Sequence, residues 1–259
     1  MEEFCESFNR ISLTSLLSLR ERKPAGRQVR VMNSLQMTKP LFASLDVYHD
    51  IASRAAALNM AIDEALLEIA TGPMIRFYKW DHPALSFGYF GKFADVANHA
   101  GQRDLVRRWT GGGIVFHGDD LTYSIVIPVS SGFFAESAKR IYAAIHSALC
   151  HALKENGAAA ALAPNNSSKI SDVCFANPVL ADVIVNGRKV AGAAQRRTRR
   201  GLLQQGSIQD VDHTNEFADQ FASKLCSKCY HKTLDEPLIA RADKIAEQKY
   251  GAASWLQRR

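Results

Sequence analysis

The dipeptide Asn186-Gly187 constrains the fold of this 259-residue chain more than any other short segment. It separates the stretches Ala181 to Val185 and Lys189 to Gln195, and Asn-Gly between two such stretches is the strongest short signal for a two-residue β-hairpin. A second turn, Arg199 to Gly201, leads directly into Leu202 to Gln209. We therefore expect neighbouring strands in this part of the chain to run antiparallel.

Other segments carry strand or helix patterns in no regular alternation. Strand character is found in Ile75 to Trp80, Pro83 to Phe90 and Leu121 to Pro128. Apolar residues recur at helical spacing in Ser53 to Ala70 and Ser137 to Asn156, and the remainder after Gln209 has helical character, finishing at Ala240 to Trp255. The absence of a repeated βαβ order predicts an α+β fold with a mainly antiparallel sheet flanked by helices.

Length and composition describe one sizeable domain. Hydrophobic residues make up 47% and charged residues 22%, and no apolar run approaches the roughly 20 residues of a spanning helix, so we expect no membrane association. Residues 1–40 differ from the rest, because they mix basic and polar residues with Pro24, Gly26 and Pro40. We expect them to be a poorly ordered extension, or to precede a true start at Met37. Residues 41–259 would then form the folded domain.

The formal net charge of +6 is concentrated in one short segment. Four arginines lie within five positions there: Arg196, Arg197, Arg199 and Arg200. No aromatic residues interleave with them, so the segment lacks the composition of a nucleic-acid site and we expect no nucleic-acid partner. Two interpretations remain, a docking surface for an acidic protein or a solvated basic turn.

The cysteines carry no framework spacing. There are five, an odd number, and the N-terminus has no secretory pattern, so we expect a reducing, cytoplasmic setting. Cys226 and Cys229 lie close to His231, but one pair and one histidine do not make a four-ligand zinc site. We expect no metal site.

The densest chemical signal is the segment RRWTGGGIVFH, Arg107 to His117. Its three consecutive glycines remove every Cβ from a turn, so the backbone can lie against a ligand and present N–H groups to it. The two arginines that precede them are suited to hold a carboxylate or phosphate. Taken alone, the segment also fits a flexible surface loop.

Several further segments extend this signal: Asn59 to Glu64, Arg76 to Trp80, Tyr123-Ser124, Asn186 to Arg196 and Gln205 to Ile208. Together they resemble the family of lipoate–protein ligases, octanoyltransferases and biotin–protein ligases, over roughly residues 45 to 259. Gly91 departs from the family pattern, in which glutamine is frequent at this position. The arginine-rich loop of the biotin–protein ligases is missing, and RRWTGGG takes its place.

The resemblance implies a fold like the catalytic domain of biotin synthetases, with an acyl-binding tunnel. It implies that Lys189, at the edge of the pocket, contacts the acyl carbonyl, where a cation stabilises oxyanion charge. Without the resemblance, Lys189 would be taken for an exposed hairpin residue. The resemblance also implies the residues that line the acyl pocket: Arg107, Arg108, Gly111, Gly112, Gly113, His117, Gly192 and Ala193.

Two reaction routes remain open at this point. Cys174 lies fifteen residues before Lys189 and resembles the nucleophile of one class of octanoyltransferases. In that class a thiolate takes octanoate from acyl carrier protein and passes it to a lysine of a lipoyl-domain protein without a cofactor. In the alternative, Cys174 is a bystander and the chain is a lipoate–protein ligase that uses ATP and Mg²⁺. A non-catalytic acyl- or carrier-binding relative is a third alternative. We favour the cysteine-dependent transferase.

Overall fold

The computed structural model describes residues 40–164, 178–211 and 214–258. They all belong to one compact unit of the chain, which starts at Gln36. Residues 1–39 of the expected extension (residues 1–40) and the candidate nucleophile Cys174 lie outside the described residues. Within the described part, no helix is both long and apolar enough to span a membrane.

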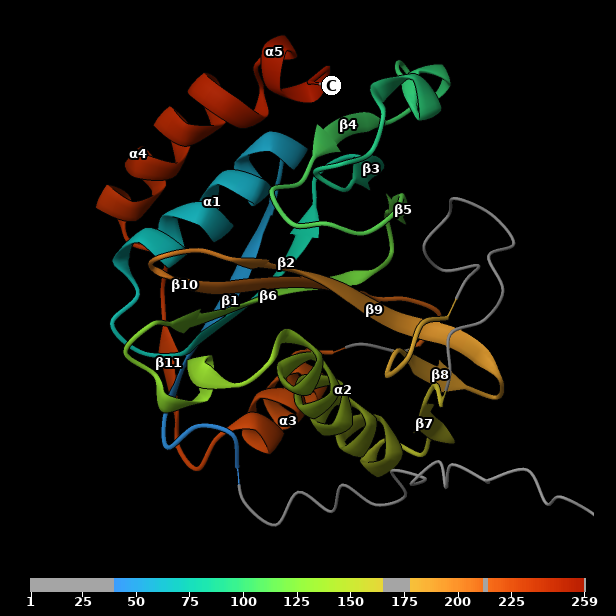
Figure 1. Cartoon of the computed structure of the whole chain (residues 1–259), viewed down its shortest axis with the longest axis vertical. Coiled ribbons are helices and arrows are strands. Elements are labelled where there is room, and N and C mark those ends of the chain that lie inside the picture. Colours follow the sequence, from blue (N-terminus) through green and yellow to red (C-terminus); the bar gives the residue numbers. More distant parts are fainter. Residues whose placement is uncertain (1–39, 165–177, 212–213, 259) are drawn as a thin grey trace, which may run out of the picture. The chain divides into compact units, whose positions relative to one another are not determined.

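Strands dominate the centre of the unit (Figure 1). Those of the described residues are β1 (Leu45–Arg54), β2 (Met74–Trp80), β3 (Ala84–Phe87), β4 (Asp104–Arg107), β5 (Val115–His117), β6 (Leu121–Pro128), β7 (Ala160–Leu162), β8 (Val183–Val185), β9 (Arg188–Arg197), β10 (Gly201–Ile208) and β11 (Cys229–Lys232).

The strands form one large and one small sheet. The large sheet has the order β11-β1-β2-β6-β10-β9-β8-β7, and the small one has the order β4-β3-β5. Pairing is parallel among β11, β1 and β2, and antiparallel from β2–β6 through to β8–β7. The predicted α+β fold with a mainly antiparallel sheet is confirmed.

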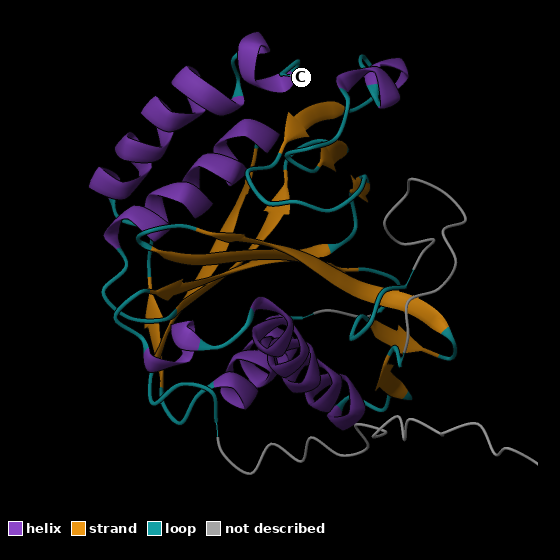
Figure 2. Ribbon diagram, viewed as in Figure 1, coloured by secondary structure: helices purple, strands orange, loops and turns teal. Residues whose placement is uncertain are grey.

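Helices cover both faces of the large sheet, as Figure 2 shows. On one face lie α1 (Ala56–Ile69) and α4 (Glu236–Ile245), which is followed by a π-helical turn (Ala246–Tyr250) and by α5 (Ala253–Leu256). On the other face lie α2 (Ala138–Glu155) and α3 (Asn215–Leu225). This two-sided cover places the central strands in the interior.

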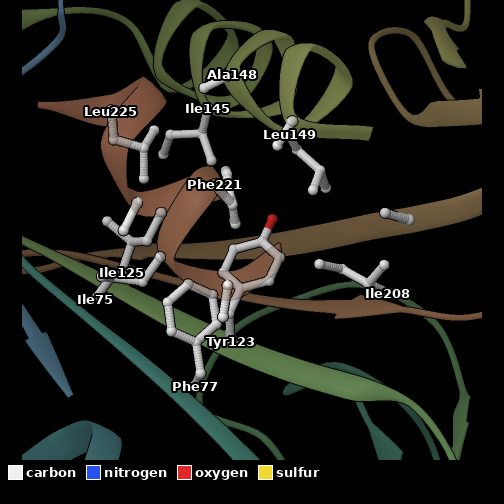
Figure 3. Packing of buried hydrophobic residues seen from close by; sticks show 14 of the residues in the cluster. Ile75, Phe77, Tyr123, Ile125, Ile145, Ala148, Leu149, Ile208, Phe221 and Leu225 are labelled. Atoms are coloured by element: carbon white, nitrogen blue, oxygen red, sulfur yellow. The ribbon is translucent and has the colours of Figure 1, made fainter. Parts of the chain in front are cut away.

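Strand β2 illustrates the consequence for the core. Ile75 and Phe77 pack towards α2 and α3, whereas Met74 and Tyr78 pack towards α1. Ile145 and Leu149 of α2 point at the same cluster from the other side (Figure 3). Both faces of β2 are therefore largely buried, and burial of each such apolar side chain contributes roughly 1.5–3 kcal/mol, whereas Arg76 on the α1 side is buried in ion pairs with Asp50 and Asp63.

Local signals in the sequence set the boundaries correctly at two places. The hairpin between β8 and β9 forms at Asn186 (φ 50°) and Gly187 (φ 79°), the pair of positive φ values that a type I′ turn requires. Helix α2 begins after Ser137, whose side chain accepts a hydrogen bond from the N–H of Arg140 at 3.2 Å.

Two expectations were wrong. The segment after Gln209 is not purely helical, because β11 pairs with β1 in parallel at the sheet edge. The first helix begins at Ala56 and not at Ser53, because β1 continues to Arg54. Neither strand alternates cleanly between apolar and polar residues. Their pairing depends on partners far away in the sequence.

Candidate active site

The glycine run lies between β4 and β5 and packs against the end of β3. A Cβ added to Gly88 would lie 2.1 Å from the carbonyl oxygen of Gly112, so the two backbones touch here. Gly112 itself has φ 85°, a conformation that other residues rarely adopt. The glycines thus allow close approach between two backbone segments, and they shape one wall of a pocket.

The two arginines before the run have different environments. The Arg107 guanidinium donates to backbone carbonyls of two segments: those of Tyr89 and Gly91 after β3, and those of Trp255, Leu256 and Arg258 at the C-terminal end. It therefore anchors the C-terminal segment, and it does not line the pocket. Arg108 does line the pocket. Its Nη2 donates to the carbonyls of Gly111 and Gly113 at 3.0 and 2.8 Å.

A buried chain of hydrogen bonds connects Arg108 to Asp120. Arg108 Nη1 donates to Ser86 Oγ at 2.6 Å, Ser86 Oγ lies 2.7 Å from His117 Nε2, and His117 Nδ1 lies 2.8 Å from Asp120 Oδ2. Because a carboxylate only accepts, His117 carries a proton on Nδ1 and donates it in a hydrogen bond to Asp120. The order matches that of a Ser-His-Asp triad. However, Ser86 Oγ already accepts a hydrogen bond from the Arg108 cation. This contact favours a role of the hydrogen-bond chain in positioning the glycine loop.

Asp120 remains ionised at the end of this chain. Burial acts to raise its pKa, but His117 and hydrogen bonds from Ser207 and the Gly118 N–H lower that pKa to about 2. Thr122 Oγ1 donates to the same carboxylate at 2.9 Å. Four donors around one carboxylate fix its orientation, and through it that of His117.

These groups surround a pocket that contains about 440 Å³ of space, solvent at its mouth included. Gly112, Ala193 and Ala194 are its more exposed residues and mark the mouth. The buried part is lined by Met60, Tyr78, Trp80, Ser86, Arg108, Val115, His117, Thr122, Gly192, Gln205 and Ser207, together with Gly206.

Trp80 forms a rigid part of this wall. Its ring stacks on His117 with centroids 4.1 Å apart, and its Nε1 donates to Thr122 Oγ1 at 2.8 Å. On β10, the side chain of Gln205 is also held by hydrogen bonds. Its Nε2 donates to Asp63 Oδ2 and its Oε1 accepts from Thr110 Oγ1, both at 2.8 Å. The polar atoms of the wall are thus occupied by protein partners, which leaves mainly carbon surface to the ligand.

Lys189 is buried beside the pocket, contrary to the expectation of a position at its edge. Its side chain is 1% exposed, and Nζ lies 2.8 Å from Asp182 Oδ2, whose side chain is 0% exposed. The lysine runs directly over Gly192, because a Cβ at Gly192 would lie 2.6 Å from Lys189 Cε. Gly192 lines the pocket, so the lysine adjoins the pocket wall without being part of it.

Tyr142 completes the Lys189 environment. Its hydroxyl donates to Asp182 Oδ1 and accepts from the N–H of Ala193, the latter at 3.1 Å. Burial, followed by the charge of Asp182, raises the pKa of Tyr142, so the phenol stays protonated. Asp182 thereby holds Lys189 and Tyr142 together, and Tyr142 fixes the backbone at the pocket mouth.

The structure therefore brings only some of the predicted site residues together at the pocket. Five line the pocket: Arg108, Gly112, His117, Gly192 and Ala193. Gly111 and Gly113 bind Arg108 through their carbonyls, Lys189 lies behind Gly192, and Arg107 faces elsewhere. Cys174 falls in the undescribed segment 165–177, so its distance to Lys189 is not part of this geometry.

Sequence reasoning missed several polar residues of the site, and the four that hold its charged groups are Ser86, Asp120, Tyr142 and Asp182. Asp120 lies three residues after His117, a spacing that offered some signal. Tyr142 and Asp182 come from α2 and from the turn before β8, and nothing in the sequence connects them. They meet only because α2 packs on the end of the sheet.

The basic turn between β9 and β10 is only partly free for docking. Arg197 donates to the carbonyls of Phe134 and Glu136. Arg196 lies over the rings of Tyr89 and Trp109, at 4.9 and 5.1 Å from their centroids. Trp109 immediately precedes Thr110 and the glycine run, so Arg196 lies close to the loop that forms the pocket wall.

Comparison with known proteins identifies the family. The model of the lipoyl protein ligase A/B catalytic domain matches residues 55–233, more than half of the chain. The chain belongs to this family. The expected family resemblance is thus confirmed.

Curated relatives are similar at moderate identity. Octanoyltransferase LipM of Oceanobacillus iheyensis is 42% identical over 164 residues, which cover 59% of this chain and 59% of that protein. Octanoyltransferase LipM of Staphylococcus aureus is 37% identical over 183 residues, which cover 64% of this chain and 66% of that protein. The matches thus span less than two thirds of the length of either relative.

Solved structures share the fold. Lipoate-protein ligase A bound with ATP superposes with a TM-score of 0.62 at 17% identity, over 83% of this chain and 98% of that one. The bi-partite lipoate protein ligase from Thermoplasma acidophilum, studied with its E2 lipoyl domain, gives 0.63 at 18% identity, over 84% and 96%. At these identities the likeness establishes the fold of the domain and no more.

Proposed function

We propose that this chain moves an octanoyl group from acyl carrier protein, through a thioester on Cys174, to a lysine of a lipoyl-domain protein. The observation that carries the proposal is the buried Lys189, which Asp182 holds directly behind Gly192, a residue that lines the largely apolar pocket. The similarity to octanoyltransferases, at 42% and 37% identity over 59% and 64% of this chain, supports the choice of acyl group.

The proposed chemistry consists of two balanced exchanges. First, the Cys174 thiolate attacks the donor thioester, a new thioester forms, and the carrier thiol leaves. Second, the acceptor lysine amine attacks the Cys174 thioester, an amide forms, and the amine proton and the cysteine sulfur end as a thiol. Each tetrahedral state carries negative charge on the acyl oxygen, which an ammonium group such as that of Lys189 would stabilise. Neither exchange requires ATP.

Two of the described cysteines, Cys150 and Cys226, are poor candidates for the nucleophile. Burial raises the pKa of the Cys150 thiol to about 12. Burial, and then the Cys229 thiol at 3.0 Å, raises the pKa of Cys226 to about 12. Thiols with such values carry almost no thiolate near neutral pH and are poor nucleophiles.

The surface near the pocket carries positive charge, which is suited to acidic partner proteins. Arg199 and Arg200 are exposed at the turn after β9, and Arg196 lies beside the glycine loop. We propose that this turn steers acidic carrier and lipoyl domains towards the pocket mouth.

Intact-mass analysis tests the proposal. Incubation with octanoyl carrier protein and no acceptor should add one octanoyl group, which hydroxylamine removes as expected for a thioester. Cys174→Ser should form no adduct that turns over, because a serine hydroxyl is far less acidic than a thiol. Cys229→Ser is the matched control and should be acylated like the wild type.

The same samples distinguish the ligase alternative. ATP with free lipoate or octanoate should support no transfer if the proposal holds. Normal activity of Cys174→Ser, dependent on ATP and a free acid, would make the chain a lipoate–protein ligase that uses the same pocket.

A further inference from the structure

A second group of potential ligands lies away from the pocket, on the α3 side of the large sheet. It consists of His49 on β1, Asp219 on α3 and His231 on β11. One ligand atom from each residue lies within 4.8 Å of the other two. The three residues come from three different elements, so their convergence is a property of the tertiary fold.

The separations within this group bracket those of a transition-metal site. His49 Nε2 forms a hydrogen bond with Asp219 Oδ1 at 2.7 Å, which an ion would replace, and His231 Nδ1 lies 3.9 Å from the same oxygen. Tetrahedral zinc with Zn–N and Zn–O bonds of about 2.0–2.2 Å separates its ligand atoms by roughly 3.3 Å. One observed distance is therefore somewhat short and the other somewhat long, each by about 0.6 Å. Small side-chain rotations would equalise them.

Two of the three side chains can make that adjustment. The ring of His49 is held by Phe77, with ring centroids 5.6 Å apart, whereas the ring of His231, which stacks on His49 at 5.7 Å, has to turn for both imidazoles to face one ion. Its side chain is only 19% exposed, whereas those of Asp219 and His231 are 48% and 58% exposed. One ligand is thus preorganised, and two can rotate towards an incoming ion.

Space for a further ligand is available next to His49. A surface hollow of about 530 Å³, open solvent included, is lined by residues that include His49, Asn215 and Ala218. Asn215 and Ala218 belong to the same helix as Asp219. A metal held by three protein ligands keeps an open position for water, and the hollow gives solvent access to it.

We propose that His49, Asp219 and His231 bind a divalent transition-metal ion, for which Zn²⁺ is the probe. Two imidazoles and one carboxylate form a borderline donor set that suits zinc and its neighbours better than Mg²⁺ or Ca²⁺. The ion links α3 and the edge strand β11 to β1. It therefore stabilises the end of the sheet at which β11, only four residues long, is otherwise held by one neighbouring strand.

The test is zinc titration by calorimetry of the full chain without a histidine tag, combined with thermal unfolding. We expect about one Zn²⁺ per chain and a melting temperature that rises with zinc concentration, because the ion binds the folded state. His231→Ala and Asp219→Asn change exposed side chains. Each substitution should weaken zinc binding by at least roughly 10–100-fold. Substitution of a residue that only supports a metal ligand already causes a loss of this size, and here a ligand itself is removed. Neither should alter the melting temperature measured with a chelator.

The chain offers two matched controls. His82 lies in another exposed group, with Asp81 and Asp104, and Cys229 lies 3.0 Å from Cys226. His82→Ala and Cys229→Ser should both bind zinc like the wild type. Loss of binding in either control, with His231→Ala unaffected, would place the ion elsewhere and overturn the proposal. Absence of zinc-dependent stabilisation in the wild type would do the same. No readout depends on acyl transfer, so the outcome is independent of the proposed function.

Discussion

Substitution of Gly192 by alanine tests whether the position of Lys189 controls the chemistry. The added Cβ would lie 2.6 Å from Lys189 Cε, 2.7 Å from Nζ and 3.3 Å from Asp182 Oδ1. Ordinary contact between non-bonded carbons begins near 3.5 Å, so the end of the lysine must move by roughly 1 Å. The backbone is not an obstacle, because Gly192 is not among the glycines with positive φ.

The expected effects on rate and on stability differ in size. Displacement of a positioned group by about 1 Å costs roughly 10²-fold in rate, and complete loss of an oxyanion donor roughly 10²–10³. The lysine end is flexible, so overpacking should cost only about 1–3 kcal/mol. For a domain of this size that corresponds to a fall in melting temperature of roughly 2–12 °C.

The assay is the rate of octanoyl transfer to a lipoyl domain, with melting followed by circular dichroism. Gly118→Ala is the matched control. A Cβ there meets no atom within 4 Å, and the backbone N–H that bonds Asp120 is kept. We expect the control to have wild-type rate and stability. If Gly192→Ala retained half of the wild-type rate, the link between Lys189 position and catalysis would be refuted.

Four further predictions follow from the same structure. Lys189→Met should abolish transfer and also lower the free energy of unfolding by about 3–5 kcal/mol in urea titrations, because it leaves the buried Asp182 carboxylate without its cation. Burial lowers the pKa of His146 to about 4, below the unfolded value near 6.5. As the pH falls, His146 is therefore protonated in the unfolded protein before it is protonated in the folded one. The free energy of unfolding should decrease by about 3 kcal/mol as pH falls from about 6.5 to about 4. His146→Gln should flatten this fall in urea titrations, and the exposed His82→Gln should not. The double substitution Arg199→Ser and Arg200→Ser should slow transfer at low salt and not at high salt. Salt screens exposed charges over about 8–10 Å near physiological ionic strength, so the contribution of these arginines is lost at high salt. Deletion of residues 1–36 should leave the melting temperature and transfer rate nearly unchanged, because that stretch has no periodic apolar face to bury.

The sequence predicted the features that depend on neighbouring residues. Asn186-Gly187 defines its own turn, and Ser137 caps α2 through an atom three residues away. It did not predict the pairing of Leu45 with Cys229, because β1 and β11 carry no alternating pattern and meet only after the whole domain is assembled. The family resemblance located Lys189, but burial of its side chain depends on Asp182 and on the absence of a Cβ at Gly192. Such contacts between distant residues cannot be obtained from the pattern of a single sequence.

Two buried carboxylates explain why the pocket walls are rigid. Asp120 orients His117, which with Ser86 holds Arg108 and hence the carbonyls of the glycine loop. Asp182 orients Lys189 and Tyr142. No buried side-chain nitrogen or oxygen among the described residues lacks a hydrogen-bond partner, so rearrangement of either wall would cost the desolvation of several groups at once. In the proposed transfer, a cation held this way would be oriented before the substrate arrives, and no free energy would be needed to reorient it when charge develops on the acyl oxygen. The same coupling makes the site vulnerable, because loss of one partner leaves a charge buried that cannot recover its hydration.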